Sequence, residues 1–316
     1  MNLFVTTPSK TIRKERLLED MWTMIKRRDL WHKIDNKIPK LTEWRKRIPS
    51  ILLLKITVLQ FVFWLSDESV EEDIHDRNSF KRFLWEELLL EWWIPDATTL
   101  CRFRKTLDKY NLHDVIFKKI NETLEEKWCF LKRWTIVDAT IVKAASSTKN
   151  KSKERDPEMK STKKGANYYF WMKVHQWTDA ETWLVHSLTC TGANVHDSQE
   201  LDNCLHWEEK YIWWDKAYDS KERVKVCREL WISYWIIKKA VRGKKLSTSQ
   251  KKHNIKHQSI RSKVERPFRV LKKRWKQNTI RYRGIRKNEI WYTIWLWLWN
   301  LILWKWYLDK ISAQEN

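Results

Sequence analysis

The chain has 316 residues, which is enough for about two domains with buried cores and excludes a peptide-sized binder. Its 63 Lys and Arg residues against 40 Asp and Glu give a formal net charge of +23, which favours a polyanionic partner, with nucleic acid the first candidate. Five scattered cysteines without a CxxC pair argue against a disulfide framework or a zinc ribbon. The N-terminal sequence lacks the apolar core of a signal peptide, so we expect a cytoplasmic protein.

The first part of the chain, residues 1–130, is predicted to be helical. Apolar residues recur at spacings of three and four in IPSILLLKITVLQFVFWL and in DVIFKKINETLEEKW, and strand-like alternation is scarce. In IPDATTLCRFRKTLDKY a Pro-Asp pair signals the start of a helix, with Leu100, Phe103 and Leu107 on one face.

This last helix suits the second helix of a helix-turn-helix, with Thr98, Thr99 and Arg102 near the DNA groove. An ordinary amphipathic helix with a solvated basic face, including Arg104 and Lys105, explains the same pattern equally well. The pattern leaves both interpretations open.

Residues 131–310 change to short β-rich runs, TIVDATIV, YYFWMKV, WLVHSLT, YIWWD and LWISYWIIK. Three early strands, then strands that alternate with helical stretches such as SKERVKVCREL, predict a mixed α/β sheet. The polar, Lys-rich stretch KAASSTKNKSKERDPEMKSTKKGAN lies between the first two strands. We expect it to be a mobile surface loop, although a loop contacting the DNA backbone would have the same composition.

The only membrane-like segment is the apolar run from Ile290 to Leu308. Asn300 and Lys305 interrupt it, and its tryptophans occur throughout instead of at its ends. A buried C-terminal helix is therefore favoured over a membrane span, and no membrane partner is expected.

Tryptophan and glycine are present in unusual amounts: 24 Trp and 4 Gly, where average usage of about 7% would give about 22 Gly. Several tryptophans stand where glycine is usual, such as Trp183 after DAET in a hairpin loop that calls for a left-handed residue, and Trp64. The same question arises at Trp134, Trp207 and Trp214. Our hypothesis is that UGA is read as glycine in this organism; a genuinely Trp-rich protein that stacks on nucleic-acid bases is the alternative.

Two aspartates mark a candidate site on the predicted sheet. Asp138 lies inside TIVDATIV, where a carboxylate is costly unless it is paired or binds a metal. Asp215 ends the run YIWWD, at the carboxyl end of a strand where open α/β sheets place their sites. Each alone is weak evidence, because a strand-end aspartate is as often a cap or turn residue.

Glu265 carries a stronger signal, because it is the only acid among twenty Lys or Arg residues within residues 230–288. A carboxylate inside a phosphate-binding surface makes sense when it holds a divalent cation that meets the phosphate. On a helical interpretation it shares a face with Arg261, Arg269 and Lys272.

The opposite stripe of that helix is apolar and expected to be buried, and comprises Ile260, Val264, Phe268 and Leu271. Pro267 implies a kink or a fresh helix start nearby. An internal salt bridge from Glu265 to Arg261 or Arg269 remains the alternative to a metal ligand.

Three carboxylates with hard oxygen ligands suit Mg²⁺ or Mn²⁺, and two such ions would serve phosphodiester hydrolysis and transesterification. His175, His186 and His196 with Asp197 form a competing cluster, but their spacings match no metal site. We expect these histidines to cap or pair within the sheet.

These residues together resemble the DDE transposases of bacterial insertion sequences, nearest the insertion-sequence-five family. SFKRFLW…WIPDATTLCRFRKTL is similar to the family's helical N-terminal domain. Its catalytic blocks are matched by TIVDATIVKAASSTKNKSKERDPEMKSTKKG, GANVHDS, WWDKAYDS and RSKVERPFRVLKKRW. The resemblance implies an α/β, RNase H-like mixed-sheet catalytic domain over residues 131–310, preceded by a helical DNA-binding domain over residues 1–130.

The resemblance also implies roles for single residues. Asp138, Asp215 and Glu265 would be the metal ligands, and Arg261 and Lys272 match the Arg and Lys of the family pattern around the glutamate. The tyrosine of that pattern is replaced here by Gln258. Further phosphate contacts are expected from Arg269 and Lys216. The family's usual glycines coincide with Trp134, Trp171, Trp177 and Trp183, which supports the glycine hypothesis.

The implied function is that of a transposase and endonuclease in the bacterial cytoplasm, associated with the nucleoid. It would bind double-stranded DNA at the terminal inverted repeats of its element, cut there and join the ends to target DNA, as a homo-oligomer. A non-catalytic DNA-binding remnant and a host nuclease of the same fold are the alternatives.

Overall fold

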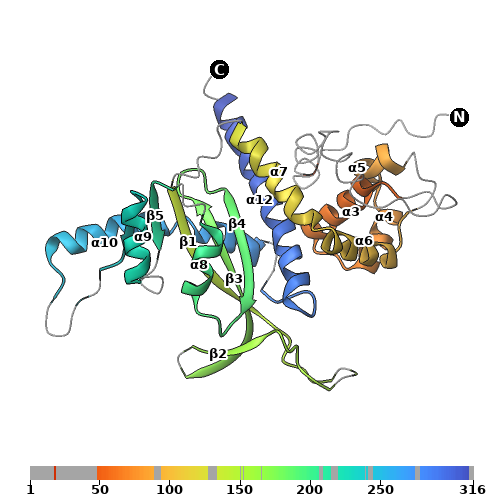
Figure 1. The fold of residues 1–316 in the computed structure, drawn as a ribbon. Helices are drawn as coiled ribbons and strands as arrows, with labels where there is room; N and C mark the ends of the chain where they lie inside the picture. Colours follow the sequence, from red (N-terminus) through yellow and green to blue (C-terminus); the bar gives the residue numbers. More distant parts are fainter. Residues whose placement is uncertain are drawn as a thin grey trace, which may run out of the picture. The chain divides into compact units, whose positions relative to one another are not determined.

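The computed structural model of the protein describes residues 18, 48–88, 94–126, 134–149, 151, 153–164, 166–205, 209–214, 220–238, 240, 245–274 and 278–312. The chain forms two compact units, residues 1–116 with 301–316 and residues 117–300. Most of their helices and strands are labelled in Figure 1. Among the predicted site residues, Asp215 and Lys216 lie outside the described residues.

The first unit is helical over its described residues, as predicted. Its helices are α3 (Ser50–Phe63), α4 (Asp67–Asp76), α5 (Asn78–Leu88) and α6 (Ala97–Lys109), and α7 (Leu112–Glu126) begins in it. Nearly all of α3 is buried, which fits its almost continuous apolar sequence. The start of α4 is capped by the Ser66 side chain, which accepts a hydrogen bond from the backbone N–H of Ser69.

The second unit is built on a six-stranded mixed sheet. Its strands are β1 (Trp134–Lys143), β2 (Lys160–Lys164), β3 (Asn167–Asp179), β4 (Val185–Gly192), β5 (Tyr211–Trp214) and β6 (Ser233–Ile236). β3 pairs antiparallel with β1, β2 and β4, whereas β5 pairs parallel with both β1 and β6. Each of the five predicted runs contains a strand, but β6 begins only at Ser233, because Leu230 and Trp231 form the turn after α9.

Helices alternate with the later strands (Figure 1). They are α8 (Asp197–Cys204), α9 (Lys221–Glu229), α10 (Thr248–Arg261), α11 (Glu265–Arg269), the π-helical turn η2 (Val270–Arg274) and α12 (Ile285–Ser312). Four strands with antiparallel pairing, β1 to β4, are followed by the parallel strands β5 and β6 with intervening helices, which is the expected mixed-sheet, RNase H-like α/β arrangement.

The polar stretch between the first two predicted strands differs from the expectation of a mobile loop. It contains β2, which pairs with the beginning of β3. It also holds two acidic caps for the last helix: Asp156 accepts a hydrogen bond from the N–H of Gly284 (2.6 Å), and Glu158 accepts one from the N–H of Ile285 (2.8 Å). The polar, Lys-rich composition did not predict β2, because a strand at the edge of a sheet can be highly polar.

The apolar C-terminal segment forms a buried helix, as predicted. Asn300, which interrupts the apolar run, is fully buried and its side chain bonds both the N–H and the C=O of Val185 (2.9 and 2.7 Å). No described helix is by itself long and apolar enough to cross a membrane; α3 and α4 pass that test only as a pair, which is bent by 99°.

Candidate active site

Asp138 lies in the middle of β1, between β3 and β5. Strand alternation puts it on the same face as Ile136, while Val137 points into the opposite core. Ile136 is fully buried and packs with Val264, the residue before α11. Asp138 and the contact between Ile136 and Val264 therefore lie on the same face of the sheet. That contact holds the segment that carries Glu265.

The Asp138 carboxylate is paired with an arginine. Nη2 of Arg261, the last residue of α10, donates a hydrogen bond to Oδ1 of Asp138 at 2.9 Å. Burial raises the pKa of Asp138, the Arg261 guanidinium counteracts that rise, and the negative charge of Glu265 adds to it. The structure thus brings two of the three predicted carboxylates, which are far apart in sequence, into electrostatic contact.

Glu265 is the first residue of α11, and it is exposed. The chain turns between Arg261 and Glu265 and then starts a new short helix, with Pro267 in its first turn, where no backbone N–H is needed. Among the described residues, none forms an ion pair or hydrogen bond with the Glu265 carboxylate, and Arg261 turns to Asp138 instead. The salt-bridge alternative to a ligand role thereby loses its support.

Three contacts fasten the segment around α11 to the sheet. Gln176, which is paired with Asp138 in the β1–β3 ladder, donates from Nε2 to the C=O of Val264 at 2.9 Å. Val264 is fully buried, and Nζ of Lys263 donates to the C=O of Ala180 at 3.2 Å. Sequence reasoning missed Gln176, although a glutamine inside an apolar strand is a signal of a buried polar contact.

Lys272, in η2, also reaches β1. Its Nζ donates to Oγ1 of Thr140 at 2.6 Å and to the C=O of Ile141 at 2.9 Å. Arg261 and Lys272 thus contact β1 on the two sides of α11 in the chain, whereas Arg269, the last residue of α11, is exposed. The segment that carries Glu265 therefore places two basic side chains against β1.

The two described carboxylates fit a divalent cation. Carboxylate oxygens are the ligands that Mg²⁺ and Mn²⁺ prefer. Asp138 and Glu265 come from different elements, and the negative charge of Glu265 helps to raise the pKa of Asp138, an effect that a cation beside Asp138 would offset. The ion pair with Arg261 shows that a positive charge can be accommodated beside this carboxylate.

The histidine cluster does not form a metal site among the residues that the structure describes. His175 and His186 each lie within hydrogen-bonding distance of a threonine hydroxyl on another strand, at 2.9 and 3.2 Å. Burial lowers the pKa of His175 to about 4. His196 caps α8, since its ring nitrogen accepts a bond from the N–H of Ser198. The interpretation that these histidines cap or pair within the sheet is confirmed.

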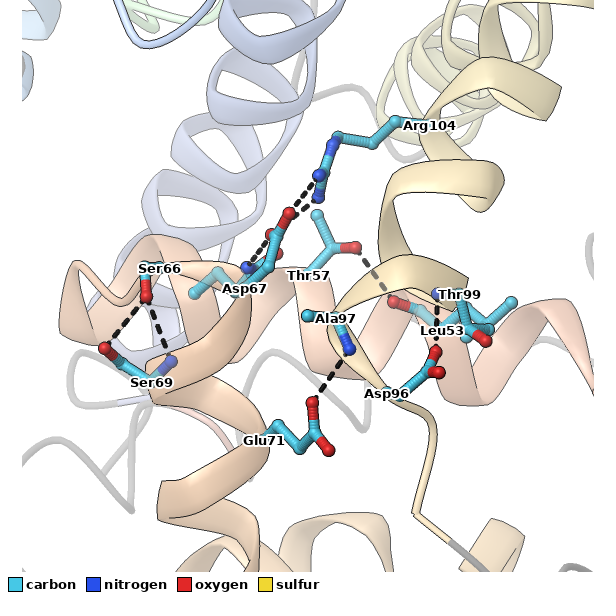
Figure 2. A network of polar contacts seen from close by, with 11 residues as sticks. Leu53, Thr57, Ser66, Asp67, Ser69, Glu71, Asp96, Ala97, Thr99 and Arg104 are labelled. Atoms are coloured by element: carbon cyan, nitrogen blue, oxygen red, sulfur yellow. Dashed lines mark hydrogen bonds and ion pairs between the residues drawn. The ribbon is translucent and has the colours of Figure 1, made fainter.

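In the helical unit, Figure 2 shows the polar contacts that position α6, the candidate DNA-reading helix. Asp96 caps it by accepting from the N–H of Thr99 at 2.7 Å, and its predicted apolar stripe is buried. Arg104 forms a two-pronged ion pair with Asp67 of α4, so it is not part of a solvated basic face. Thr98 and Arg102 are exposed. Their contact with DNA stays a prediction.

Comparison with known families gave two matches. The family model of the transposase DDE domain matches residues 130–301. A second family model, described as Transposase domain (DUF772), matches residues 7–106.

Proposed function

The chain belongs to the DDE transposases, enzymes that cut DNA and transfer its ends by transesterification, and we propose that it acts on the terminal inverted repeats of its own insertion sequence, nearest the insertion-sequence-five group. It would cut the DNA at these repeats and join the ends to target DNA. The observation that carries the proposal is the ion pair between Asp138 and Arg261, beside the segment in which Glu265 contributes negative charge at Asp138.

Asp138, Asp215 and Glu265 are proposed to hold Mg²⁺ or Mn²⁺, with two ions in the complete site. The bound ions would activate water or a DNA 3′-hydroxyl and stabilise the leaving oxygen. Support for Asp215 comes from the pairing of β1 with β5, because Ile136 and Trp213 are partners and each precedes one of the aspartates by two residues. Asp215 itself lies outside the described residues.

The basic residues of the same segment are proposed to hold the DNA backbone. Arg261, Arg269 and Lys272 line the segment that carries Glu265, and Lys216 follows Asp215. In the absence of DNA, Arg261 neutralises Asp138 and Lys272 bonds to β1. A phosphate entering the site would compete with these internal partners for the two cations.

Residues 1–130 are proposed to recognise the terminal repeat, with Thr98, Thr99 and Arg102 of α6 facing the DNA. The exposure of Thr98 and Arg102 supports this assignment. Because transposition joins two DNA ends, the active complex would contain at least two copies of the chain, acting at the bacterial nucleoid.

The test is Mg²⁺-dependent cleavage and strand transfer on DNA carrying the element's own ends. The chain as written is assayed beside a form with glycine at the suspect tryptophans. Activity that disappears with Asp138→Ala, Asp215→Ala or Glu265→Ala supports the proposal. DNA binding without metal-dependent cleavage would indicate a non-catalytic remnant, and cutting without strand joining would indicate a nuclease of the same fold.

A further inference from the structure

Three tryptophans adopt a backbone conformation that suits glycine. Trp64, Trp183 and Trp231 have φ of 62°, 62° and 56°; the other non-glycine residues with positive φ in the described part of the chain are Asn111 and Lys153. Asparagine tolerates this left-handed region, whereas for a bulky side chain it is an outlier. Three of the five non-glycine residues with positive φ in the described part of the chain are therefore tryptophans.

The hydrogen bonds after α9 form the motif by which helices end at a glycine. The N–H of Trp231 donates to the C=O of Arg228 at 3.2 Å, and the N–H of Ile232 donates to the C=O of Cys227 at 2.7 Å. In this motif the residue at the position of Trp231 is left-handed and most often glycine. Its side chain is 92% exposed, so buried packing does not compensate for the strain.

A left-handed tryptophan also stands at the end of α3 and in the hairpin loop between β3 and β4. The N–H of Leu65 and the N–H of Trp64 both donate to the C=O of Gln60, with Trp64 left-handed at the helix end. Trp183 closes the loop between β3 and β4, where its N–H donates to the C=O of Asp179 at 2.9 Å. Such loops end in a left-handed residue, usually glycine.

We infer that positions 64, 183 and 231 are glycine in the native protein, because the organism reads UGA codons as glycine. The backbone geometry at three separate turns and the chain's 24 Trp beside 4 Gly are independent observations that agree. At Trp183 the Arg266 guanidinium lies 3.7 Å from the ring centroid, a contact that an authentic tryptophan would explain.

The gene and the native protein decide between these readings. We expect UGA codons at all three positions, and peptides of the protein isolated from its own organism with the residue mass of glycine there. A UGG codon, or intact tryptophan in the native peptide, overturns the inference at that position.

A stability comparison tests the backbone reading separately. Trp231→Gly and Trp231→Ala both remove the indole, but only alanine keeps a Cβ that resists the left-handed conformation. We expect the glycine variant to melt roughly 2–4 °C higher than the alanine variant. At Trp304, in the right-handed helix α12, the order should reverse. An alanine variant as stable as glycine at position 231 would contradict the strain on which the inference depends.

A separate observation assigns Gln176 as a positioning residue for the metal site, an inference that rests on the proposed function. Gln176 is fully buried, is paired with Asp138 across the ladder, and holds the C=O of Val264 directly before Glu265. Its amide therefore links β3, the strand next to the one that bears Asp138, to the residue directly before the helix that bears Glu265. Losing it would free Glu265 to move away from Asp138.

Gln176→Met removes the amide donor while keeping a similar length, and Thr178→Val is the matched control, two residues along the same strand and fully buried. We expect Gln176→Met to speed amide hydrogen exchange in α11 and to raise the Mg²⁺ concentration needed for half-maximal thermal stabilisation about tenfold, with no DNA present. The control should change neither.

Two outcomes are decisive. A Gln176→Met variant with the parent's exchange rate in α11 and the parent's Mg²⁺ response would overturn the positioning role. A parent protein that shows neither Mg²⁺ stabilisation nor cleavage would instead overturn the proposed function, and the assignment of Gln176 with it.

Discussion

The two described carboxylates of the site are held in opposite ways. Asp138 belongs to a central strand, is largely buried, and has an arginine partner. Glu265 is exposed at the start of a five-residue helix that is fastened to the sheet through its neighbours Lys263 and Val264. One side of the site is a rigid sheet wall; the other, the segment from Arg261 to Arg274, is an attached helical arm.

This difference shows how the proposed metal site could have one ligand in a fixed position and another in an adjustable position. The wall fixes one ligand through the pairing of whole strands, whereas the arm depends on a few hydrogen bonds that a substitution can remove singly. Changes to the wall should therefore affect stability and activity together. Changes to the exposed side chains of the arm, such as Glu265, should affect activity more than stability.

The largest expected effect concerns the carboxylates themselves. Asp138→Asn and Glu265→Gln should each lower Mg²⁺-dependent cleavage by on the order of 10³-fold, because each would remove a negative ligand from the proposed metal site. DNA binding in the absence of Mg²⁺ should persist in both. Glu265→Gln should change the free energy of unfolding by less than about 0.5 kcal/mol, since the side chain is exposed. Cleavage that survives either change would separate that residue from the chemistry.

Lowering the pH should decrease the free energy of unfolding through His175, which lies in β3. Its pKa falls from 6.5 to about 4, mainly because of burial; Asp197 opposes that shift and Lys173 adds to it. Between these pH values the unfolded chain binds a proton that the folded chain does not, so stability declines as pH drops, by on the order of 2–3 kcal/mol. Denaturant unfolding at pH 7 and pH 4.5 measures the loss. His175→Gln should reduce it, and an unchanged pH slope in that variant would contradict the assignment.

A smaller effect is expected at the contact between wall and arm. Arg261→Gln should lower the free energy of unfolding by about 1–3 kcal/mol, because it leaves the partly buried Asp138 carboxylate without its charged partner. Arg269→Gln, on the same arm but exposed, is the matched control and should stay within about 0.5 kcal/mol. Equal losses in the two variants would show that the wall does not depend on this ion pair.

The smallest effect is expected at Lys272. Lys272→Met should weaken DNA binding and reduce the slope of log affinity against log salt by about one, if its ammonium meets a phosphate in the complex. The measurement is binding to the terminal repeat across a series of salt concentrations. An unchanged slope would mean that Lys272 serves only its hydrogen bonds to Thr140 and Ile141.

Much of the fold was predictable from the sequence because each strand and helix carries its own periodic pattern. The strand around Asp138, the buried stripe containing Val264 and Phe268, and the fresh helix start near Pro267 were all expected and are confirmed. β2 was missed, because a short run of lysines and hydroxyl residues has no apolar face to reveal an edge strand.

By itself, the sequence determined which residues are chemically unusual: an aspartate in a core strand, one acid in a long basic stretch, and tryptophans where turns call for glycine. These signals are local, since they arise from residue type and spacing. Only the tertiary structure decided which of them meet. It brought Asp138 near Glu265, turned Arg261 from Glu265 to Asp138, and linked Gln176 to Val264. Such pairings depend on strand register and helix placement, which are set by the packing of the whole sheet and leave no periodic trace in the chain.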